Sequence, residues 1–263
     1  MPAASKSPRQ TTQRSQKASA SRNSAARAAR VATADSRDSG EGEYAVAPAG
    51  ACVPIPDAMS AEDAAAFQIA YGTSHLALVG PGQIAPGETL LVLGAAGGVG
   101  LTAVEIGAVL GARVIAVARG QDKLAIAEAA GAEILIDAED DTLLAQLKAL
   151  GGVDIVYAPV GGALAQAALR ACKRGGHYIL IGFASGEVPS FKLNHLLVKN
   201  ISVHGFYWGG YLEFDAPALR ASLAELFALY ETGKLKPHIG LLSPHADAGA
   251  ALEKLRRRET TGK

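Results

Sequence analysis

A glycine-rich turn between a strand pattern and a helix pattern restricts what this chain can fold into more than any other feature. The stretch from Thr89 to Leu93 is almost wholly apolar, as in strands buried on both faces of a parallel sheet. Four glycines follow within residues 94–100, and apolar side chains then recur at helical spacing as far as Leu110. A strand, a glycine turn and a helix in this order are the context in which glycines bind the diphosphate of a dinucleotide. We therefore predict a nucleotide-binding domain.

Strand and helix patterns alternate along most of the chain, at the lengths of βαβ units. We expect further strands at Arg113–Ala118, Ile134–Ile136, Val153–Tyr157, His177–Ile181 and Ile201–Phe206, with a short one around His238–Leu242. We expect helices at Ala61–Val79, opened by Ser60 and broken at Gly72, and at Gln121–Ala130, Leu143–Leu150, Pro217–Tyr230 and Ala248–Arg258. The alternation predicts an α/β fold, a Rossmann-type doubly wound parallel sheet that binds ligands at the carboxyl ends of its strands.

The beginning of the chain differs in kind from the rest. Residues 1–40 hold eight Lys and Arg against two Asp, and Val31 is their only large apolar side chain after Met1. Such a segment buries too little apolar surface to offset the entropy of folding, so we predict a disordered basic tail over residues 1–42. A transit peptide is an alternative, but it would need an apolar helical face. A basic arm that binds nucleic acid or anionic lipid is a second alternative, but the segment has no aromatic residue that would support such binding.

Composition narrows the class of partner. The formal net charge is zero, which gives no argument for a nucleic-acid or membrane partner. No apolar run is long enough to span a bilayer. The two cysteines, Cys52 and Cys172, exclude a four-thiolate zinc site and are typical of a reducing cytosol. We expect a cytoplasmic protein with a small-molecule ligand, bound neither to nucleic acid nor to a membrane.

The glycine turn has the pattern A-x-G-x-x-G, in which Ala95 departs from the strict dinucleotide motif. Gly97 would let the backbone approach a pyrophosphate, and Gly100 would let the helix pack closely on the strand. The amides of Gly98 and Val99 would lie where the helix dipole favours an anion. The alternative is a tight strand–helix turn that serves packing only.

The residues after the second strand indicate which dinucleotide would bind. An NAD site would have an acidic residue at the end of that strand, where it accepts hydrogen bonds from the ribose. This chain has Arg119 and, four residues later, Lys123, two cations that suit a 2′-phosphate. We therefore predict NADPH as the cofactor. The alternative is an ordinary solvated helix start, in which Asp122 pairs with its neighbours.

Six stretches in sequence order form a pattern far more specific than the glycine turn alone. They are Ala70–Thr73, Pro86–Thr89, Leu93–Gly100, Tyr157–Gly162, Ile181–Gly186 and Tyr207–Gly209. Over about residues 42–263 the chain thereby resembles the zinc-independent NADPH:quinone oxidoreductases of the medium-chain dehydrogenase/reductase superfamily. One departure is Ala158, which stands where that family usually has an acidic residue.

The resemblance implies roles for individual residues. It places Thr73 near the nicotinamide, Ala96, Gly97, Gly98 and Val99 at the pyrophosphate, Arg119 and Lys123 at the adenosine phosphate, Val160, Phe183 and Ser185 along the cofactor, and Phe206 and Tyr207 beside the nicotinamide and substrate. Without the resemblance, the three aromatic side chains would be interpreted as core packing. No catalytic residue is assigned, although Tyr71 and Tyr207 are phenols that could donate a proton.

The resemblance also implies an activity and a domain organisation. The activity is hydride transfer from NADPH to a quinone or an α,β-unsaturated carbonyl. Zinc would take no part, because the Gly-His-Glu motif and the clustered cysteines of the zinc-dependent relatives are absent from this sequence. Its histidines also have no metal-ligand spacing. The expected parts are a tail (1–42), a remnant and lead-in helix of a GroES-like domain (43–80), an NADP-binding Rossmann domain (81–215), and C-terminal helices with an incomplete return to the GroES-like domain (216–263).

Two other interpretations stay open. Because most of the GroES-like domain of the family has no counterpart here, the chain could be a truncated, catalytically inactive NADPH-binding module. It could also be a cofactor-binding partner protein whose basic tail docks elsewhere. The family commonly forms dimers through an edge strand of the nucleotide sheet, and the strand expected at Ile201–Phe206 could supply that edge.

Overall fold

The computed structural model describes residues 30–33, 47 and 52–263. Its centre is a parallel sheet with the strand order β5-β4-β3-β6-β7-β8, which is the order of a Rossmann fold. The strands are β3 (Thr89–Leu93), β4 (Arg113–Ala118), β5 (Ile134–Asp137), β6 (Val153–Ala158), β7 (Cys172–Leu180) and β8 (Ser202–Gly205). The predicted fold class is confirmed. The order reverses between β3 and β6, which is where doubly wound sheets bind their ligands.

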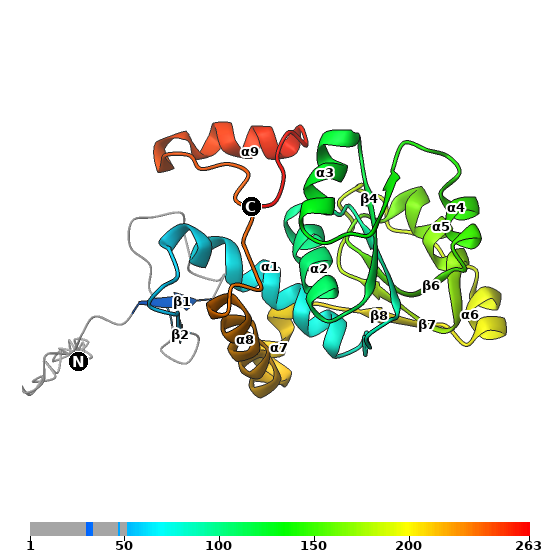
Figure 1. The fold of residues 1–263 in the computed structure, drawn as a ribbon, viewed down its shortest axis with the longest axis horizontal. Helices are drawn as coiled ribbons and strands as arrows, with labels where there is room; N and C mark the ends of the chain where they lie inside the picture. Colours follow the sequence, from blue (N-terminus) through cyan, green and yellow to red (C-terminus); the bar gives the residue numbers. More distant parts are fainter. Residues whose placement is uncertain (1–29, 34–46, 48–51) are drawn as a thin grey trace, which may run out of the picture.

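Helices cover both faces of the sheet because successive strand residues point to opposite sides. Leu90 and Val92 of β3 face a core shared with α1, α2 and α8, whereas Leu91 and Leu93 face a core shared with α4 and α5. Figure 1 shows these two layers of helices with the sheet between them. The helices are α1 (Ala61–Val79), α2 (Gly98–Val109), α3 (Gln121–Ala129), α4 (Leu143–Ala149), α5 (Gly162–Ala171), α6 (Leu193–Lys199), α7 (Tyr211–Phe214), α8 (Ala216–Glu231) and α9 (Ala248–Arg256).

Helix α1 begins as predicted, but the expected break at Gly72 is wrong. The side chain of Ser60 caps the helix by accepting a hydrogen bond of 2.9 Å from the amide of Asp63. The helix then continues without interruption through Gly72 to Val79. Gly72 is instead a packing position, because a β-carbon there would lie 2.7 Å from Nε1 of Trp208.

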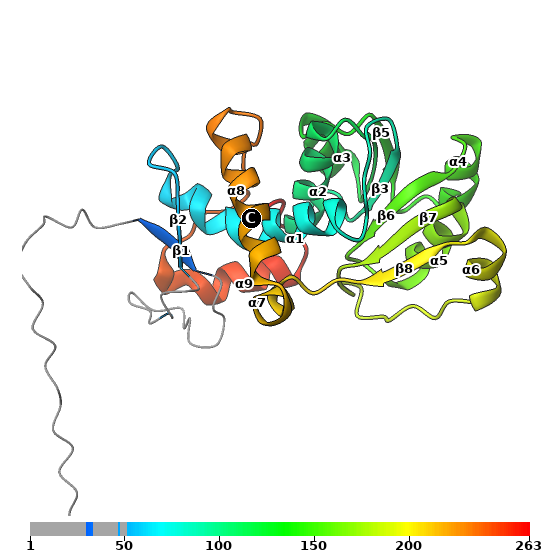
Figure 2. The ribbon, with the colours of Figure 1, turned by 90° about the horizontal axis from the view of Figure 1, so that it is seen from below.

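A small second sheet corrects the prediction for the tail at four described residues. Val31–Thr33 forms strand β1, which pairs antiparallel with β2 (Cys52–Pro54). The side chain of Arg30 also donates to the carbonyl of Asp57 over 3.2 Å. These residues are therefore ordered by pairing with β2, a contact that their own sequence does not indicate. The rest of the predicted tail, residues 1–29 and 34–42, lies outside the described residues. Figure 2 shows β1 and β2 at the opposite end of the molecule from α6.

Other differences lie in the second half of the chain. Helices α5 and α6 were not predicted, and the strand expected around His238–Leu242 is wrong, since that segment has no regular secondary structure. The backbone there is instead held by two hydrogen bonds: the amide of Gly240 donates to the carbonyl of Lys263, and the amide of Lys263 donates to the carbonyl of His238. These two bonds do not extend into a strand ladder. Short 3₁₀ turns at Trp208–Gly210 and His245–Asp247 precede α7 and α9.

Candidate functional site

The glycine turn lies at the carboxyl end of β3, beside the point where the strand order reverses. Gly97 is the N-cap of α2 and has no side chain to cap the first amides of the helix. Together with the helix dipole, these amides suit an anionic group. The hollow beside the turn has a volume of about 580 Å³ and is lined by Gly94, Ala96–Gly100 and residues from neighbouring loops.

Steric contacts explain two of the glycines and the alanine in the motif. Gly94 has φ +65°, and a β-carbon on it would lie 2.8 Å from the side chain of Val160. A β-carbon on Gly100 would lie 2.1 Å from the carbonyl oxygen of Gly94, so only glycine lets α2 approach the strand this closely. Ala95 is fully buried in the core, where its methyl group is accommodated. The departure at Ala95 is therefore compatible with the fold of the turn.

Four cations line the same hollow away from the glycine turn. Arg119 follows β4, Lys123 lies in the first turn of α3, and Arg256 and Arg258 come from the end of the chain. No Asp or Glu is among the residues that line this hollow. The turn after β4 is ordered instead by Asp137 at the end of β5, whose carboxylate accepts hydrogen bonds from the amide of Gly120. A ligand with a diphosphate and a further phosphate matches this charge distribution.

The cations from the end of the chain are the part of the site that sequence reasoning missed. The guanidinium of Arg256 donates two hydrogen bonds of 2.7 Å to the carboxylate of Glu253. Arg258 donates to the carbonyl of Ala184, and its own carbonyl accepts a hydrogen bond of 2.7 Å from Lys123. The basic run was visible in the sequence, but only the folded chain shows that it reaches the hollow. Leu255, Thr260 and Gly262 line the hollow as well.

A second hollow, of about 470 Å³, lies beyond the loop after β7 and has aromatic walls. Phe183 belongs to it, whereas Ser185, two residues on, lines the cofactor hollow, so this loop connects the two. Tyr211 lies 5.4 Å from Phe206 between ring centroids and 4.4 Å from Phe214. No charged side chain is among the lining residues. A flat, apolar ligand suits these walls.

All but one of the predicted site residues line one of these two hollows. Ala96, Gly97, Gly98, Val99, Arg119, Lys123, Val160 and Ser185 line the first, and Phe183, Phe206 and Tyr207 line the second. Phe206 is 7% exposed and Tyr207 is 76% exposed, so Phe206 is a buried part of the wall and Tyr207 an exposed part. Thr73 is buried in α1 and lines neither.

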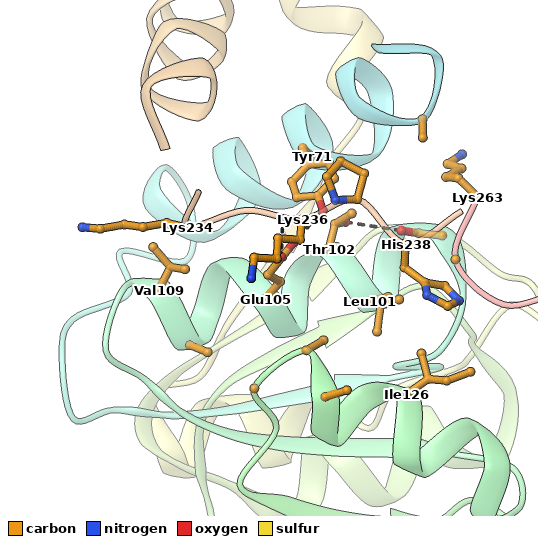
Figure 3. Close-up of a pocket in the computed structure, with 18 of the residues that line it drawn as sticks. Tyr71, Leu101, Thr102, Glu105, Val109, Ile126, Lys234, Lys236, His238 and Lys263 are labelled. Atoms are coloured by element: carbon orange, nitrogen blue, oxygen red, sulfur yellow. Dashed lines mark hydrogen bonds between the residues drawn. The ribbon is translucent and has the colours of Figure 1, made fainter. Parts of the chain in front are cut away.

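A third hollow, of about 730 Å³, lies between α1, α2, α3 and the segment after α8 (Figure 3). Tyr71 donates a hydrogen bond of 2.5 Å to Glu105, which also accepts one of 2.6 Å from the amide of Lys236. Burial and the neighbouring Glu105 raise the pKa of Tyr71, so the phenol stays protonated as a donor. Burial likewise raises the pKa of Glu105. Tyr71 and Glu105 are therefore already paired with each other in this hollow.

Neither a metal centre nor a membrane-spanning helix is found in the described part of the chain. Within residues 30–33, 47 and 52–263, no three His, Cys, Asp or Glu side chains gather as they would around a metal ion. Across the same residues, no helix combines the length and the apolar character needed to cross a bilayer.

Comparison with known proteins connects this geometry to a family. A family model described as zinc-binding dehydrogenase matches residues 98–224. The quinone oxidoreductase-like protein 2 homolog of Nematostella vectensis is 36% identical over 229 residues, which cover 85% of this chain and 62% of that protein. Quinone oxidoreductase-like protein 2 of Bos taurus is 35% identical over 213 residues, covering 80% of this chain and 61% of that protein. The chain thus spans less than two thirds of the length of these relatives.

Solved structures give the same result. The quinone oxidoreductase from Thermus thermophilus, determined also in complex with NADPH, matches with a TM-score of 0.75 at 35% identity. That match covers 85% of this chain and 72% of the other. The Escherichia coli quinone oxidoreductase complexed with NADPH matches with a TM-score of 0.75 at 31% identity, over 81% of this chain and 67% of the other. The chain therefore belongs to the quinone oxidoreductase family of the medium-chain dehydrogenase/reductase superfamily.

Proposed function

We propose that this protein is an NADPH-dependent oxidoreductase that transfers a hydride to a quinone or an α,β-unsaturated carbonyl without zinc. The observation that carries the proposal is the hollow in which a glycine turn and cations from three segments converge with no acidic residue. Relatives of the same family were solved with NADPH, which supports the same cofactor here.

The chain's own residues bind and orient the cofactor. The amides that open α2, at Gly98 and Val99, would hold the pyrophosphate, and Arg119, Lys123 and Arg258 would hold the 2′-phosphate. Lys123 already donates to a carbonyl, but an ammonium group has three donors, so it can also meet a phosphate. Ser185 and Phe183 lie on the loop that leads from this hollow to the aromatic one.

The aromatic hollow would hold the hydride acceptor. Bound NADPH would supply the hydride, and the residues of the hollow would keep the acceptor in line with it. Of the two phenols singled out in the sequence, Tyr71 is paired with Glu105 in the third hollow. Tyr207 lines the aromatic hollow and would be the one to supply the proton that completes reduction.

The test is a titration with NADPH followed by an assay of cofactor oxidation with a naphthoquinone, a phenanthrenequinone and a short enal. We expect binding, and turnover with at least one acceptor that survives treatment with a metal chelator. Turnover lost on chelation and restored by zinc would contradict the zinc-free mechanism. Absence of NADPH binding would contradict the function as a whole.

Cofactor binding without turnover is a second candidate. The specific observation in its favour is the open wall of the aromatic hollow, where Tyr207 is 76% and Phe214 is 70% exposed. A site this accessible to water shields a reacting group poorly. NADPH binding with no oxidation by any acceptor would select this candidate.

We also propose a homodimer through β8. This strand ends the sheet order and pairs only with β7 among the described strands, so its other edge offers backbone groups to a second chain. Leu193 and Leu197 on the adjacent α6 are 73% and 79% exposed. Light scattering should give twice the mass of the chain, and the mass of a single chain would contradict the dimer.

A further inference from the structure

Residues 259–263, here called the strap, lie across the glycine turn of the cofactor hollow and pair with it. The amide of Gly262 donates a hydrogen bond of 2.9 Å to the carbonyl of Ala96. Gly262 also forms a parallel bridge with Gly97, and a bridge of this kind directs the carbonyl of Gly262 at the amide of Gly98. Gly262 lines the cofactor hollow together with these turn residues. A segment of the chain therefore lies where the turn would receive a ligand.

The amide of Gly98 is the point of conflict between the strap and a cofactor. Gly98 is the first residue of α2, and the proposed site needs its amide for the pyrophosphate. An amide has one hydrogen, so the carbonyl of Gly262 takes the place of a phosphate oxygen there. The side chain of Lys263 also lies over Gly98, since a β-carbon on that glycine would be 3.0 Å from Lys263 Cε. The strap and a pyrophosphate therefore compete for the start of α2.

The strap is held by surface contacts and not by the core. None of residues 259–263 is buried, and they form neither a helix nor a strand ladder. The strap begins after Arg258, whose φ of +60° turns the chain away from α9. At its other end, the amide of Lys263 donates to the carbonyl of His238 over 3.1 Å, at one side of the third hollow (Figure 3). Because its release would expose little apolar surface, the strap can leave the turn without unfolding the domain.

We propose that the strap is an autoinhibitory segment, which occupies the amide of Gly98 when no cofactor is bound and has to leave for NADPH to bind. This inference rests on the proposed NADPH function. The apparent dissociation constant rises by the inverse of the fraction of molecules whose turn is free. If about one molecule in ten has a free turn, the strap weakens binding about tenfold. Loosening the strap should therefore tighten NADPH binding, whereas damage to the site would weaken it.

Two variants loosen the strap from different sides. Gly262→Ala places alanine at a φ of +59°, which disfavours it, and the new methyl group would clash with the carbonyl oxygen of His238. Gly240→Ala acts from outside the cofactor hollow, because its methyl group would clash with the carbonyl oxygen of Thr261. The matched control is Gly249→Ala in α9, where nothing lies within 4 Å of the new methyl group.

Calorimetry on the full chain measures the effect on affinity. We expect both strap variants to bind NADPH and NADH about tenfold more tightly than the wild type does, and the control to bind as the wild type does. Both cofactors carry the pyrophosphate, so the gain should be equal for the two. Unchanged or weaker binding in both variants would overturn the inference. A gain confined to NADPH would overturn it too, by placing the effect at the 2′-phosphate.

Amide hydrogen exchange tests the displacement in the wild type, without any variant. The amides of Gly262 and Lys263 are hydrogen-bonded to backbone carbonyls, so they should exchange slowly before NADPH is added. On saturation with NADPH they should exchange several-fold faster, while the amides of residues 98–101 become more protected. Unchanged or slower exchange at Gly262 and Lys263 would show the strap staying in place beside the cofactor and would overturn the inference. If neither the wild type nor the two strap variants bind NADPH, the proposed function is contradicted and the inference falls with it.

Discussion

The indole of Trp208 lies directly against the backbone of Gly72, where a β-carbon would be 2.7 Å from the indole Nε1. Gly72 is in the middle of α1, and Trp208 opens the 3₁₀ turn that follows the last strand of the sheet. Trp208 is 5% exposed, so this contact is part of the core. The missing side chain therefore lets the lead-in helix pack against the loop that carries the neighbouring aromatic hollow.

This contact predicts an unusual response to Gly72→Ala. Alanine normally stabilises a helix by up to about 1 kcal/mol relative to glycine. Here overpacking against the indole should reverse the sign and lower the free energy of unfolding by about 1–3 kcal/mol. Urea denaturation measures the change, and Gly249→Ala, in open space on α9, is the matched control. Adding Trp208→Phe should restore part of the loss; equal stability of Gly72→Ala and wild type would refute the packing role.

The bond between Tyr71 and Glu105 leads to a second prediction. Glu105→Ala would remove the acceptor for both the Tyr71 phenol and the Lys236 amide. Leaving these donors unpaired should cost about 1–3 kcal/mol of unfolding free energy. Glu128→Ala, at an exposed position of α3, should change it by no more than about 0.5 kcal/mol. Similar losses in the two variants would show that the Glu105 link contributes nothing specific.

The third prediction concerns pH. His75 is 2% exposed and lies between Ser222, 2.9 Å from its Nδ1, and Glu225, 3.4 Å from its Nε2. Burial lowers the pKa of His75 from 6.5, against the opposing influence of Glu225. In the window between that lowered pKa and 6.5 the unfolded chain binds a proton that the folded chain does not, so stability falls as pH decreases through it.

His75→Asn should remove this contribution, because the amide can replace the contact to Ser222 without titrating. Unfolding free energies of the two proteins, measured at several pH values from about 7.5 to about 5.5, should therefore diverge in slope, with wild type losing more. His204 also has a lowered pKa, through burial and its neighbour His177, and it is common to both proteins, so it cancels in the difference. Parallel pH curves would exclude His75 as a source of the dependence.

The sequence predicted the sheet well because its signals are local. Strands β3 and β4 have the predicted bounds, since continuous apolar runs such as Thr89–Leu93 are needed where both faces are buried. Helix α5 was missed because it opens at Gly161 and Gly162, two glycines with positive φ that look like turn residues. Its packing against β6 and β7 becomes visible only in three dimensions.

The site shows the same division between local and distant signals. The glycine turn and the cations Arg119 and Lys123 lie within one βαβ unit, and their spacing reveals them. Arg258 and Gly262 complete the hollow from the far end of the chain, and no periodicity connects them to Ala96. What could not be predicted is a tertiary pairing, made by a segment with no regular secondary structure.

The last prediction tests the choice of cofactor. Replacing both Arg119 and Lys123 by Ala should weaken NADPH by on the order of tenfold more than NADH, because only NADPH carries the 2′-phosphate. Titrations of both cofactors measure the ratio, which should shrink as salt is added because exposed charges are screened. The matched control replaces Lys148 and Lys254, exposed residues that do not line the hollow, and removes the same formal charge. If both cofactors lose affinity equally, the two cations do not bind the 2′-phosphate and the NADPH assignment fails.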